Sequence, residues 1–304
     1  MADIFERKTR ETRGEWIITR LIQAAGYSSI LFVLMIFYFL IANGLPVLGE
    51  IRLSDLFNTV WYPIESYYGI LPLILGSLVV TLGAALVGVP VGILTAVYIS
   101  EIAPNWAREV LKPLIEILAG IPSVVLGFLG ILVLSPFLRE SLDLPTGLTA
   151  LAGSLLLGAI AIPTIVSISE DALNTVPKSY REAALALGTT RWQTIWGVTV
   201  PAARSGILMA VMLGIGRSIG ETMTVMMVTG NAPVMPKSLG ALFAPIRTMT
   251  ATIASEMGEV AGGSPHYHVL FFIGIILFLI TLGVNVMASR IAFRTRKRSE
   301  RVLS

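Results

Sequence analysis

Two charged residues lie where a charge is costly, in the apolar stretch AVMLGIGRSIGETMTVMMVTGN that covers residues 210–231. Arg217 and Glu221 are four residues apart, so in one continuous helix both side chains would project from the same face and could pair. Near the middle of a membrane each such charge costs about 2.5–3.5 kcal/mol, and intramembrane charges usually face a cavity and mark a pathway. The pattern predicts either a substrate pathway or a buried ion pair that only fixes helix packing.

Few other residues suggest chemistry. Glu116 follows Lys112 by one helical turn, which predicts a structural pair at a membrane interface. His266 and His268 form an H-x-H in an expected external loop, with too few neighbouring ligands to predict a metal site. There is no cysteine, and no lysine follows a glycine as a phosphate-binding P-loop requires. We therefore predict no catalytic residues, no metal, no cofactor and no ATP hydrolysis by this chain.

The composition is that of an integral membrane protein. Apolar residues make up 55% of the 304 residues and charged residues only 13%, about half the share of a soluble domain. The net charge of +3 is too small to suggest nucleic-acid binding. No small-residue cleavage site follows the first apolar run, so we expect that run to remain as a helix.

The apolar runs predict an all-α protein with six transmembrane helices, because about 20 apolar residues span a bilayer. The uncharged stretch 66–100 is read as one long helix, kinked at Pro90, and the third span as interrupted at 120–122. The predicted spans are 21–48, 71–99, 111–138, 148–168, 205–229 and 269–292. The long loop 230–268 contains a mixed apolar stretch, 238–257, which we expect to lie as an interfacial helix over the outer mouth.

Positive residues predict which side each loop faces, since Lys and Arg accumulate on the cytoplasmic side. Of the 22 Lys and Arg residues, 17 lie at the two ends of the chain, near residues 108–112, and in the loop 176–206. We therefore expect both termini and the loop 176–206 in the cytoplasm.

The loop 176–206 is charged and capped between two membrane-length runs, and it predicts a compact helix–turn–helix, which we call the knob. Pro177 is suited to a first helical turn, and Gly188 to the left-handed residue that closes the first helix. A threonine at 189 or 190 can cap a second short helix over residues 191–197. Trp192 and Trp196 would then share one face of that helix.

The knob resembles the EAA loop of ABC-importer permease subunits, whose pattern is E-A-A, three residues, G, nine residues and I-x-L-P. Glu182, Ala183 and Ala184 precede Gly188 at the matching distance, and the sequence VTVP at 198–201 replaces the last element with valines. In that family the loop docks in a groove of a separate ATPase. The resemblance therefore implies ATPase contacts at Tyr180, Arg181, Glu182, Ala183, Ala184, Gly188 and Trp192.

The fifth run is similar to the corresponding helix of phosphate ABC-importer permeases, through GRSIGETM at 216–223 and Gly230-Asn231. The continuation Met223-Thr224-Val225 favours the PstC type over its paralogue. Further matches are YGILP at 68–72, residues 248–254 and HYH at 266–268. The resemblance covers roughly residues 68–285, and the first seventy match only in having one extra span.

This resemblance implies a type I ABC-importer permease that forms half of the translocation pathway of a phosphate importer in a prokaryotic inner membrane. The implied partners are a second permease of similar fold, two ATPase subunits, a periplasmic phosphate-binding protein and membrane lipid. Arg217 can donate to two phosphate oxygens. Glu221 can accept the proton that phosphate keeps near neutral pH and that sulfate lacks.

Three regions are expected: residues 1–70 with the cytoplasmic N-terminus, first span and an external loop, a permease core at 71–292, and a basic cytoplasmic tail at 293–304. Two alternatives stay open: a permease for another oxyanion, and a stand-alone secondary transporter. Against the secondary transporter, the sequence lacks the inverted repeats typical of that class.

Overall fold

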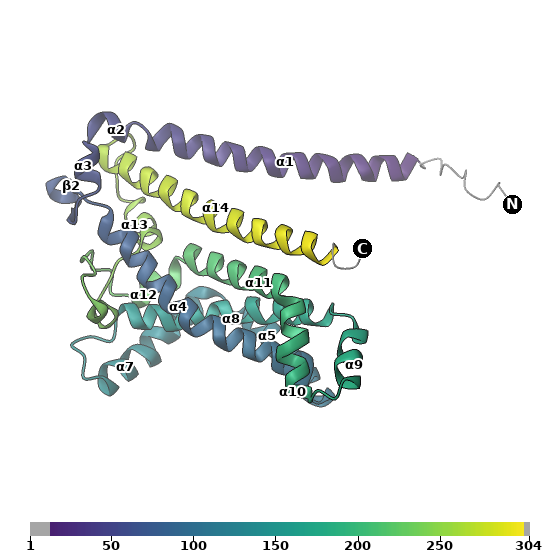
Figure 1. Ribbon diagram of the computed structural model, residues 1–304. Coiled ribbons are helices and arrows are strands. Elements are labelled where there is room, and N and C mark those ends of the chain that lie inside the picture. Colours follow the sequence, from purple (N-terminus) through teal and green to yellow (C-terminus); the bar gives the residue numbers. More distant parts are fainter. Residues whose placement is uncertain (1–12, 301–304) are drawn as a thin grey trace.

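The computed structural model describes residues 13–300, which form an almost entirely helical molecule (Figure 1). Six helical segments are long and apolar enough to cross a membrane, which confirms the six-span prediction and makes this a multi-pass membrane protein. These segments are Trp16–Glu50, Leu71–Ile102, Ser123–Ser141, Ala150–Asn174, Arg191–Gly220 and Pro265–Met287. The predicted basic tail lies partly outside the described residues, which end at 300.

The first third of the described chain contains the first two spans and a small hairpin. Its elements are α1 (Arg13–Gly44), α2 (Val47–Glu50), α3 (Leu53–Leu56), β1 (Trp61–Tyr62), β2 (Tyr67–Tyr68) and α4 (Leu71–Val97). The hairpin strands are antiparallel, with Trp61 opposite Tyr68. A π-helical turn, η2 (Tyr98–Ile102), extends α4, so one span covers Leu71–Ile102, as predicted for this uncharged stretch, with Pro90 inside its helix.

The remaining elements follow in two groups. Before the knob they are α5 (Asn105–Gly120), α6 (Ser123–Leu129), the π-turn η3 (Gly130–Leu134), α7 (Ser135–Ser141) and α8 (Ala150–Asn174). From the knob onward they are α9 (Lys178–Ala186), α10 (Arg191–Thr194), η4 (Ile195–Thr199), α11 (Val200–Gly220), α12 (Met223–Val228), η5 (Leu239–Phe243), α13 (Met249–Glu256) and α14 (Pro265–Glu300).

Helices α4 and α8 pack at the centre of the molecule, where glycines allow their backbones to approach. A side chain built at Gly88 would meet the backbone oxygen of Gly158 at 2.9 Å, so neither position has room for a larger residue. Helix α11 also packs against α8, and Ile165 of α8 contacts both Gly214 of α11 and Gly92 of α4. Small residues that let helices approach closely are the usual basis of helix packing in lipid.

Helix α1 lies apart from this centre and runs beside α14 (Figure 1). Phe37 and Phe39 contact Phe278 and Phe271 of α14, with ring centroids 5.1 and 5.4 Å apart. Most other side chains of α1 are exposed and apolar, which is the composition expected of a surface covered by lipid or by another membrane protein.

Two predicted spans are corrected. The third prediction, 111–138, joined two helices: the backbone leaves α5 at Ile121-Pro122, and the segment that is long and apolar enough to span is Ser123–Ser141. The predicted interruption at 120–122 is confirmed, since the residue before a proline disfavours helix. The fifth prediction, 205–229, began too late and ended too late, because the helix runs unbroken from α10 through Pro201 and stops at Gly220.

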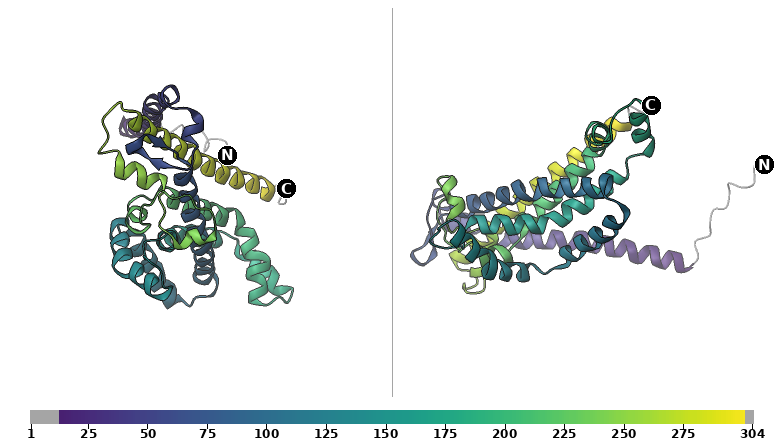
Figure 2. Two further views of the ribbon diagram at one scale, coloured as in Figure 1. Left: turned by 90° about the vertical axis from the view of Figure 1, so that its left-hand side faces the viewer. Right: turned by 90° about the horizontal axis from the view of Figure 1, so that it is seen from below.

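The knob helices α9 and α10 lie at one end of the molecule, together with the start of α1 and the last turns of α14 (Figures 1 and 2). At the opposite end lie α2, α3, the hairpin and α13. The described ends of the chain, residues 13 and 300, thus share one end with the knob, as an even number of spans requires.

Candidate functional site

The predicted Arg217–Glu221 pair does not form. Helix α11 ends at Gly220, and Glu221 has extended backbone angles, so the two side chains are not one turn apart on a continuous helix. No ion pair joins them among residues 13–300. Instead, Oε1 of Glu221 accepts hydrogen bonds from the backbone N–H groups of Thr222 and Thr224, at 3.2 and 3.3 Å. Glu221 therefore supplies acceptors for the first turn of α12, where the N–H groups have no helical partner.

Arg217 is exposed, although it lies in a membrane-spanning segment. Its guanidinium donates to Oγ1 of Thr164, near the middle of α8, at 3.2 Å. It borders a small space of about 30 Å³ beside Ile121 and Ser123, at the break between α5 and α6. Within the described chain no carboxylate balances its charge.

The two helix breaks lie next to each other. Thr224, in the first turn of α12, donates to the backbone oxygen of Ser123, in the first turn of α6, at 2.9 Å. Thr250 donates to the backbone oxygen of Glu221 at 3.0 Å. Non-helical backbone at membrane depth is tolerated where such contacts satisfy it or where it lines a cavity. The break between α5 and α6 thus contacts the first turn of α12 and also borders Arg217.

Helix α13, which was expected to lie at the membrane interface, contacts the break between α11 and α12 through Thr250. Its first residues, Met249 to Thr252, are buried, and Thr248 caps it by accepting from the N–H of Ala251. The interfacial position of 238–257 stays a prediction; the structure adds that the threonines of this stretch bond within the protein. Thr248 and Thr250 share a hydrogen bond of 3.2 Å.

Sequence reasoning did not identify Thr164, Thr224 or Thr250 as part of this site. A threonine inside an apolar helix gives no distinctive pattern, because its hydroxyl commonly bonds a backbone carbonyl of its own helix. These three threonines differ because each one bonds a group on another segment of the chain, which only the three-dimensional structure shows.

The knob folds much as predicted. Helix α9 ends before Gly188, whose φ of +80° is the left-handed conformation expected there. Thr190 caps α10 in a reciprocal capping box with Gln193. The predicted second helix is longer than expected, since α10 continues through η4 into α11. The knob is therefore rigidly continuous with the span that carries Arg217.

The residues predicted to contact an ATPase divide into an outward and an inward group. Tyr180, Glu182, Ala183, Gly188 and Trp192 are exposed. Trp192 and Trp196 share one face, as predicted, and their rings lie 5.7 Å apart, edge to face. Leu185 and Leu187 add exposed apolar area to the same region.

Ala184 and Arg181 belong to the inward group. Ala184 is buried, and its backbone oxygen accepts from the hydroxyl of Thr189. Arg181 turns away from solvent and forms an ion pair of 2.6 Å with Glu101 at the end of the second span.

Lys112 pairs with Glu170 of α8 at 3.2 Å, not with Glu116 as predicted. The hydrogen bond from Lys112 to Glu170, and then the charge of Glu170, raise the pKa of Lys112. Glu116 is exposed. The periodicity placed the two residues on one face correctly, but a partner from another helix offered a more buried carboxylate.

At the opposite end the histidines tie separate segments together. Both lie in the first turns of α14, where a loop was expected. His266 bonds Glu256 at 2.8 Å, and His268 bonds Glu50 at 3.0 Å. Glu256 also pairs with Arg247 at 2.6 Å. Among residues 13–300, no group of three His, Cys, Asp or Glu side chains is arranged to hold a metal ion.

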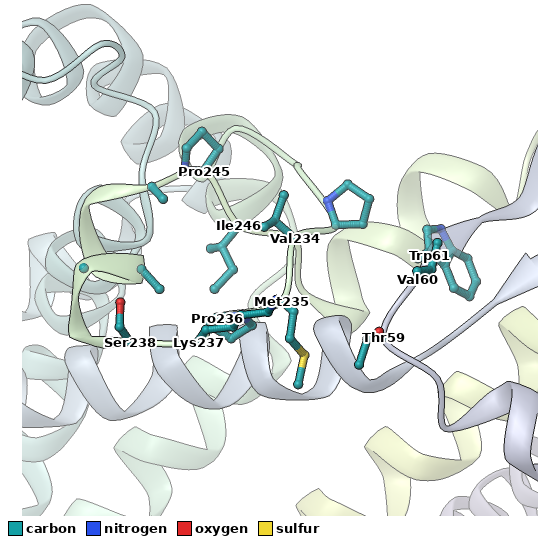
Figure 3. Close-up of a pocket in the computed structure, with 14 residues that line it drawn as sticks. Thr59, Val60, Trp61, Val234, Met235, Pro236, Lys237, Ser238, Pro245 and Ile246 are labelled. Carbon is teal, nitrogen blue, oxygen red and sulfur yellow. The ribbon is translucent and has the colours of Figure 1, made fainter.

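The same end carries an open cavity of about 580 Å³, which separates the segment 59–61 from the loop after α12 (Figure 3). Lys237 is the charged residue in its lining, and none of the predicted site residues reaches it. The cavity is therefore distinct from the position of Arg217.

Comparison with known proteins agrees with this architecture. The family model described as the binding-protein-dependent transport system inner membrane component matches residues 88–297. The probable ABC transporter permease protein YqgH of Bacillus subtilis (strain 168) is 42% identical, over 93% of each chain. The phosphate transport system permease protein PstC of Xylella fastidiosa (strain 9a5c) is 32% identical, over 96% of this chain and 94% of its own.

A solved structure shares the fold at lower identity. It is a bacterial alginate ABC transporter in complex with an alginate pentasaccharide-bound periplasmic protein, with a TM-score of 0.63, 17% identity and coverage of 90% of this chain and 94% of that one. The six spans, the knob and the matched range therefore agree: the chain belongs to the family of inner membrane components of binding-protein-dependent transport systems.

Proposed function

We propose that this chain is a transmembrane permease subunit of an ATP-driven phosphate importer. It forms half of the translocation pathway and couples to a separate ATPase through the knob. The observation that carries the proposal is the exposed guanidinium of Arg217 in a spanning segment, held by Thr164 alone within the described chain.

The exposure of Arg217 supports a shared pathway. A cation facing lipid would cost several kcal/mol, about 2.5–3.5 on insertion scales, so this face requires a water-filled passage or another protein. A second permease of similar fold would provide the opposite wall. Arg217 would then point into the passage between the two subunits.

The surroundings of Arg217 suit an oxyanion. A guanidinium donates to two oxygens in one plane, and Thr164 orients it from one side. Oε1 of Glu221 is used by α12, and Oε2 has no hydrogen bond within residues 13–300, so Oε2 is available to a phosphate proton. Discontinuous helices are a recurrent setting for substrate sites in transporters.

Relatives support phosphate as the substrate, since several are named phosphate transport system permease proteins at 32–34% identity over most of the chain. The partners follow from the same assignment: a second permease, two ATPase subunits and a periplasmic phosphate-binding protein. The knob end would face the cytoplasm of a prokaryotic inner membrane, with both termini on that side. The first span and its external loop would lie in residues 1–70. Residues 71–292 would form the permease core, and residues 293–304 the cytoplasmic tail.

The exposed part of the knob is the proposed ATPase contact. Trp192 is 61% exposed and lies edge to face against Trp196, an arrangement that leaves a large aromatic surface without an intramolecular partner. Exposed aromatic residues of this kind often dominate the binding energy of an interface.

Uptake by the assembled complex in proteoliposomes tests the function. We expect labelled phosphate to cross the membrane only when ATP is present on the knob side, where the ATPase would bind. Excess sulfate should compete only weakly with phosphate. Uptake driven by an ion gradient without ATP would support the secondary transporter, and equal competition by sulfate would support a general oxyanion permease.

The docking surface is tested with Trp192→Ala, with Trp106→Ala as a matched control. Trp106 is 70% exposed on α5 and lies outside the knob. We expect Trp192→Ala to weaken ATPase co-purification by about tenfold or more, the effect of a typical interface anchor. Equal retention of the ATPase by both variants would contradict the proposed docking role of the knob.

A further inference from the structure

The π-helical turn η2 (Tyr98–Ile102), at the knob end of the second span, is the meeting point of three other elements. Glu101 bonds the knob, Ser100 bonds α8 through Asn174 at 2.9 Å, and the backbone oxygen of Ser100 accepts from Arg108 of α5 at 2.7 Å. Single π-turns inside α-helices occur frequently at functional sites. The turn has this many side-chain partners although it contains no predicted site residue.

Arg181 makes the strongest of these connections. Its Nε and Nη2 grip both carboxylate oxygens of Glu101, at 2.6–3.2 Å. Nη1 donates to the backbone oxygen of Val176 at 2.7 Å, and Nη2 to that of Leu173 at 2.9 Å. Four of the five guanidinium N–H groups are therefore used within the chain. A residue with so few free donors is poorly suited to bind a second protein.

Burial makes the connection rigid. The side chains of Arg181 and Glu101 are 22% and 9% exposed. Two charges removed from water are stable only with good geometry and further hydrogen bonds, and loss of one partner leaves the other charge unpaired. Arg181 also donates to the backbone oxygen of Leu173, in the last turn of α8, and to that of Val176, just beyond the helix. Displacement of the knob must therefore move η2 and the end of α8 or break this arrangement.

Two further contacts carry the connection to α5. Arg108 donates to the backbone oxygens of Ser100 and Ala103, which holds the start of α5 against the end of η2. Lys112, one turn later, bonds Glu170 of α8. Helix α5 leads directly to the break at Ile121-Pro122, beside Arg217. Polar contacts thus join the knob to the start of α5, and the helix itself extends from there to the break beside Arg217.

We propose that Arg181 and Glu101 are positioning residues that transmit displacement of the knob to the second span and to α5, and that Arg181 is not an ATPase contact. This inference rests on the proposed coupling function. It assigns to the EAA segment two separate tasks: an exposed face for docking and one inward arginine for transmission.

The test compares Arg181→Gln and Glu101→Gln in the assembled complex, with Glu109→Gln as control. Glu109 is an exposed carboxylate on α5 at the same end. We expect each variant of the pair to retain the ATPase and to hydrolyse ATP, while phosphate transported per ATP falls about tenfold or more, the size of a typical coupling free energy between two sites. Glu109→Gln should behave as wild type. A purely structural role would lower assembly and hydrolysis together.

A covalent bridge keeps the test informative if the glutamine variants fold poorly. The chain has no cysteine, so Arg181→Cys with Glu101→Cys can be joined by a short, reducible bifunctional thiol reagent. We expect bridging to raise transport per ATP severalfold over the unbridged double variant, and reduction to reverse the gain.

Three results would overturn the inference. The first is an unchanged ratio of phosphate transported per ATP in Arg181→Gln. The second is loss of ATPase binding in Arg181→Gln while Glu101→Gln keeps the wild-type ratio. The third is no rise in that ratio when the two cysteines are bridged. The proposed function would fail separately, through retention of the ATPase by Trp192→Ala.

Discussion

Arg181 and Arg217 are both arginines near helix ends, yet they meet opposite surroundings. Arg181 bonds Glu101 and two backbone carbonyls, and it is mostly buried. Arg217 bonds one hydroxyl, that of Thr164, and it is exposed within a spanning segment. The first has its hydrogen-bonding capacity almost filled by its own chain. Arg217 leaves most of its donors available to a ligand or to another subunit.

The difference distinguishes an arginine that stabilises from one that awaits a partner. A guanidinium carries five donors, and burial without acceptors is costly, so a filled set indicates contacts made within the chain rather than with a partner. An unfilled set in a membrane indicates a cavity, a ligand or a neighbouring subunit. The two residues should therefore respond in opposite ways when stability and transport are measured separately.

Stability should show the largest contrast. Arg181→Ala leaves the buried carboxylate of Glu101 unpaired, and we expect it to lower the free energy of unfolding by about 3–5 kcal/mol. Arg217→Gln should lower it by only about 0.5–1.5 kcal/mol, because it removes one hydrogen bond, that to Thr164. Thermal unfolding in detergent, followed by circular dichroism, measures both. Equal loss of stability would remove the distinction between the two arginines.

Gly188→Ala should have an intermediate effect, confined to the knob. Its φ of +80° costs a residue with a side chain about 1–2 kcal/mol, while no neighbouring atom lies within 4 Å of the added carbon. We expect a matching fall in ATPase affinity, seen as a right-shifted titration of purified permease with ATPase. The exposed helical substitution Ala183→Ser is the comparison, and a larger loss in that variant would argue that contact, not backbone conformation, limits docking.

Thr164→Val should have the smallest effect. It removes one hydrogen bond and keeps the shape of the side chain, which corresponds to about 0.5–1.5 kcal/mol. We expect a severalfold rise in the phosphate concentration for half-maximal uptake, with the maximal rate nearly unchanged. Uptake at a series of phosphate concentrations checks this. An unchanged curve would mean that Thr164 does not orient the arginine during transport.

Sequence alone predicted the parts of this structure that depend on local composition. Apolar length gave six spans, and the break before Pro122 followed from the restriction that a proline imposes on its neighbour. The left-handed Gly188 and the cap at Thr190 follow from the same kind of local chemistry. The resemblance to ABC-importer permeases was confirmed by the family match.

Contacts between distant segments were not predictable in the same way. The Arg217–Glu221 spacing predicted a pair, but the helix ended one residue before Glu221 because that carboxylate caps the next helix. The partner of Arg181 lies 80 positions earlier, and the partner of Lys112 lies 58 positions later. A periodic pattern reports which residues share a face, and it contains no information on which helix packs against that face.

The most direct test of the central claim is ATP-dependent uptake of labelled phosphate by the complex with Arg217→Gln, with Arg217→Lys measured alongside. Assembly and ATP hydrolysis would be measured in the same preparations. The account predicts loss of uptake in Arg217→Gln with assembly intact, and partial uptake in Arg217→Lys, which keeps the charge without the planar fork. Uptake at the wild-type rate in Arg217→Gln would contradict the account and leave the knob as the one functional assignment.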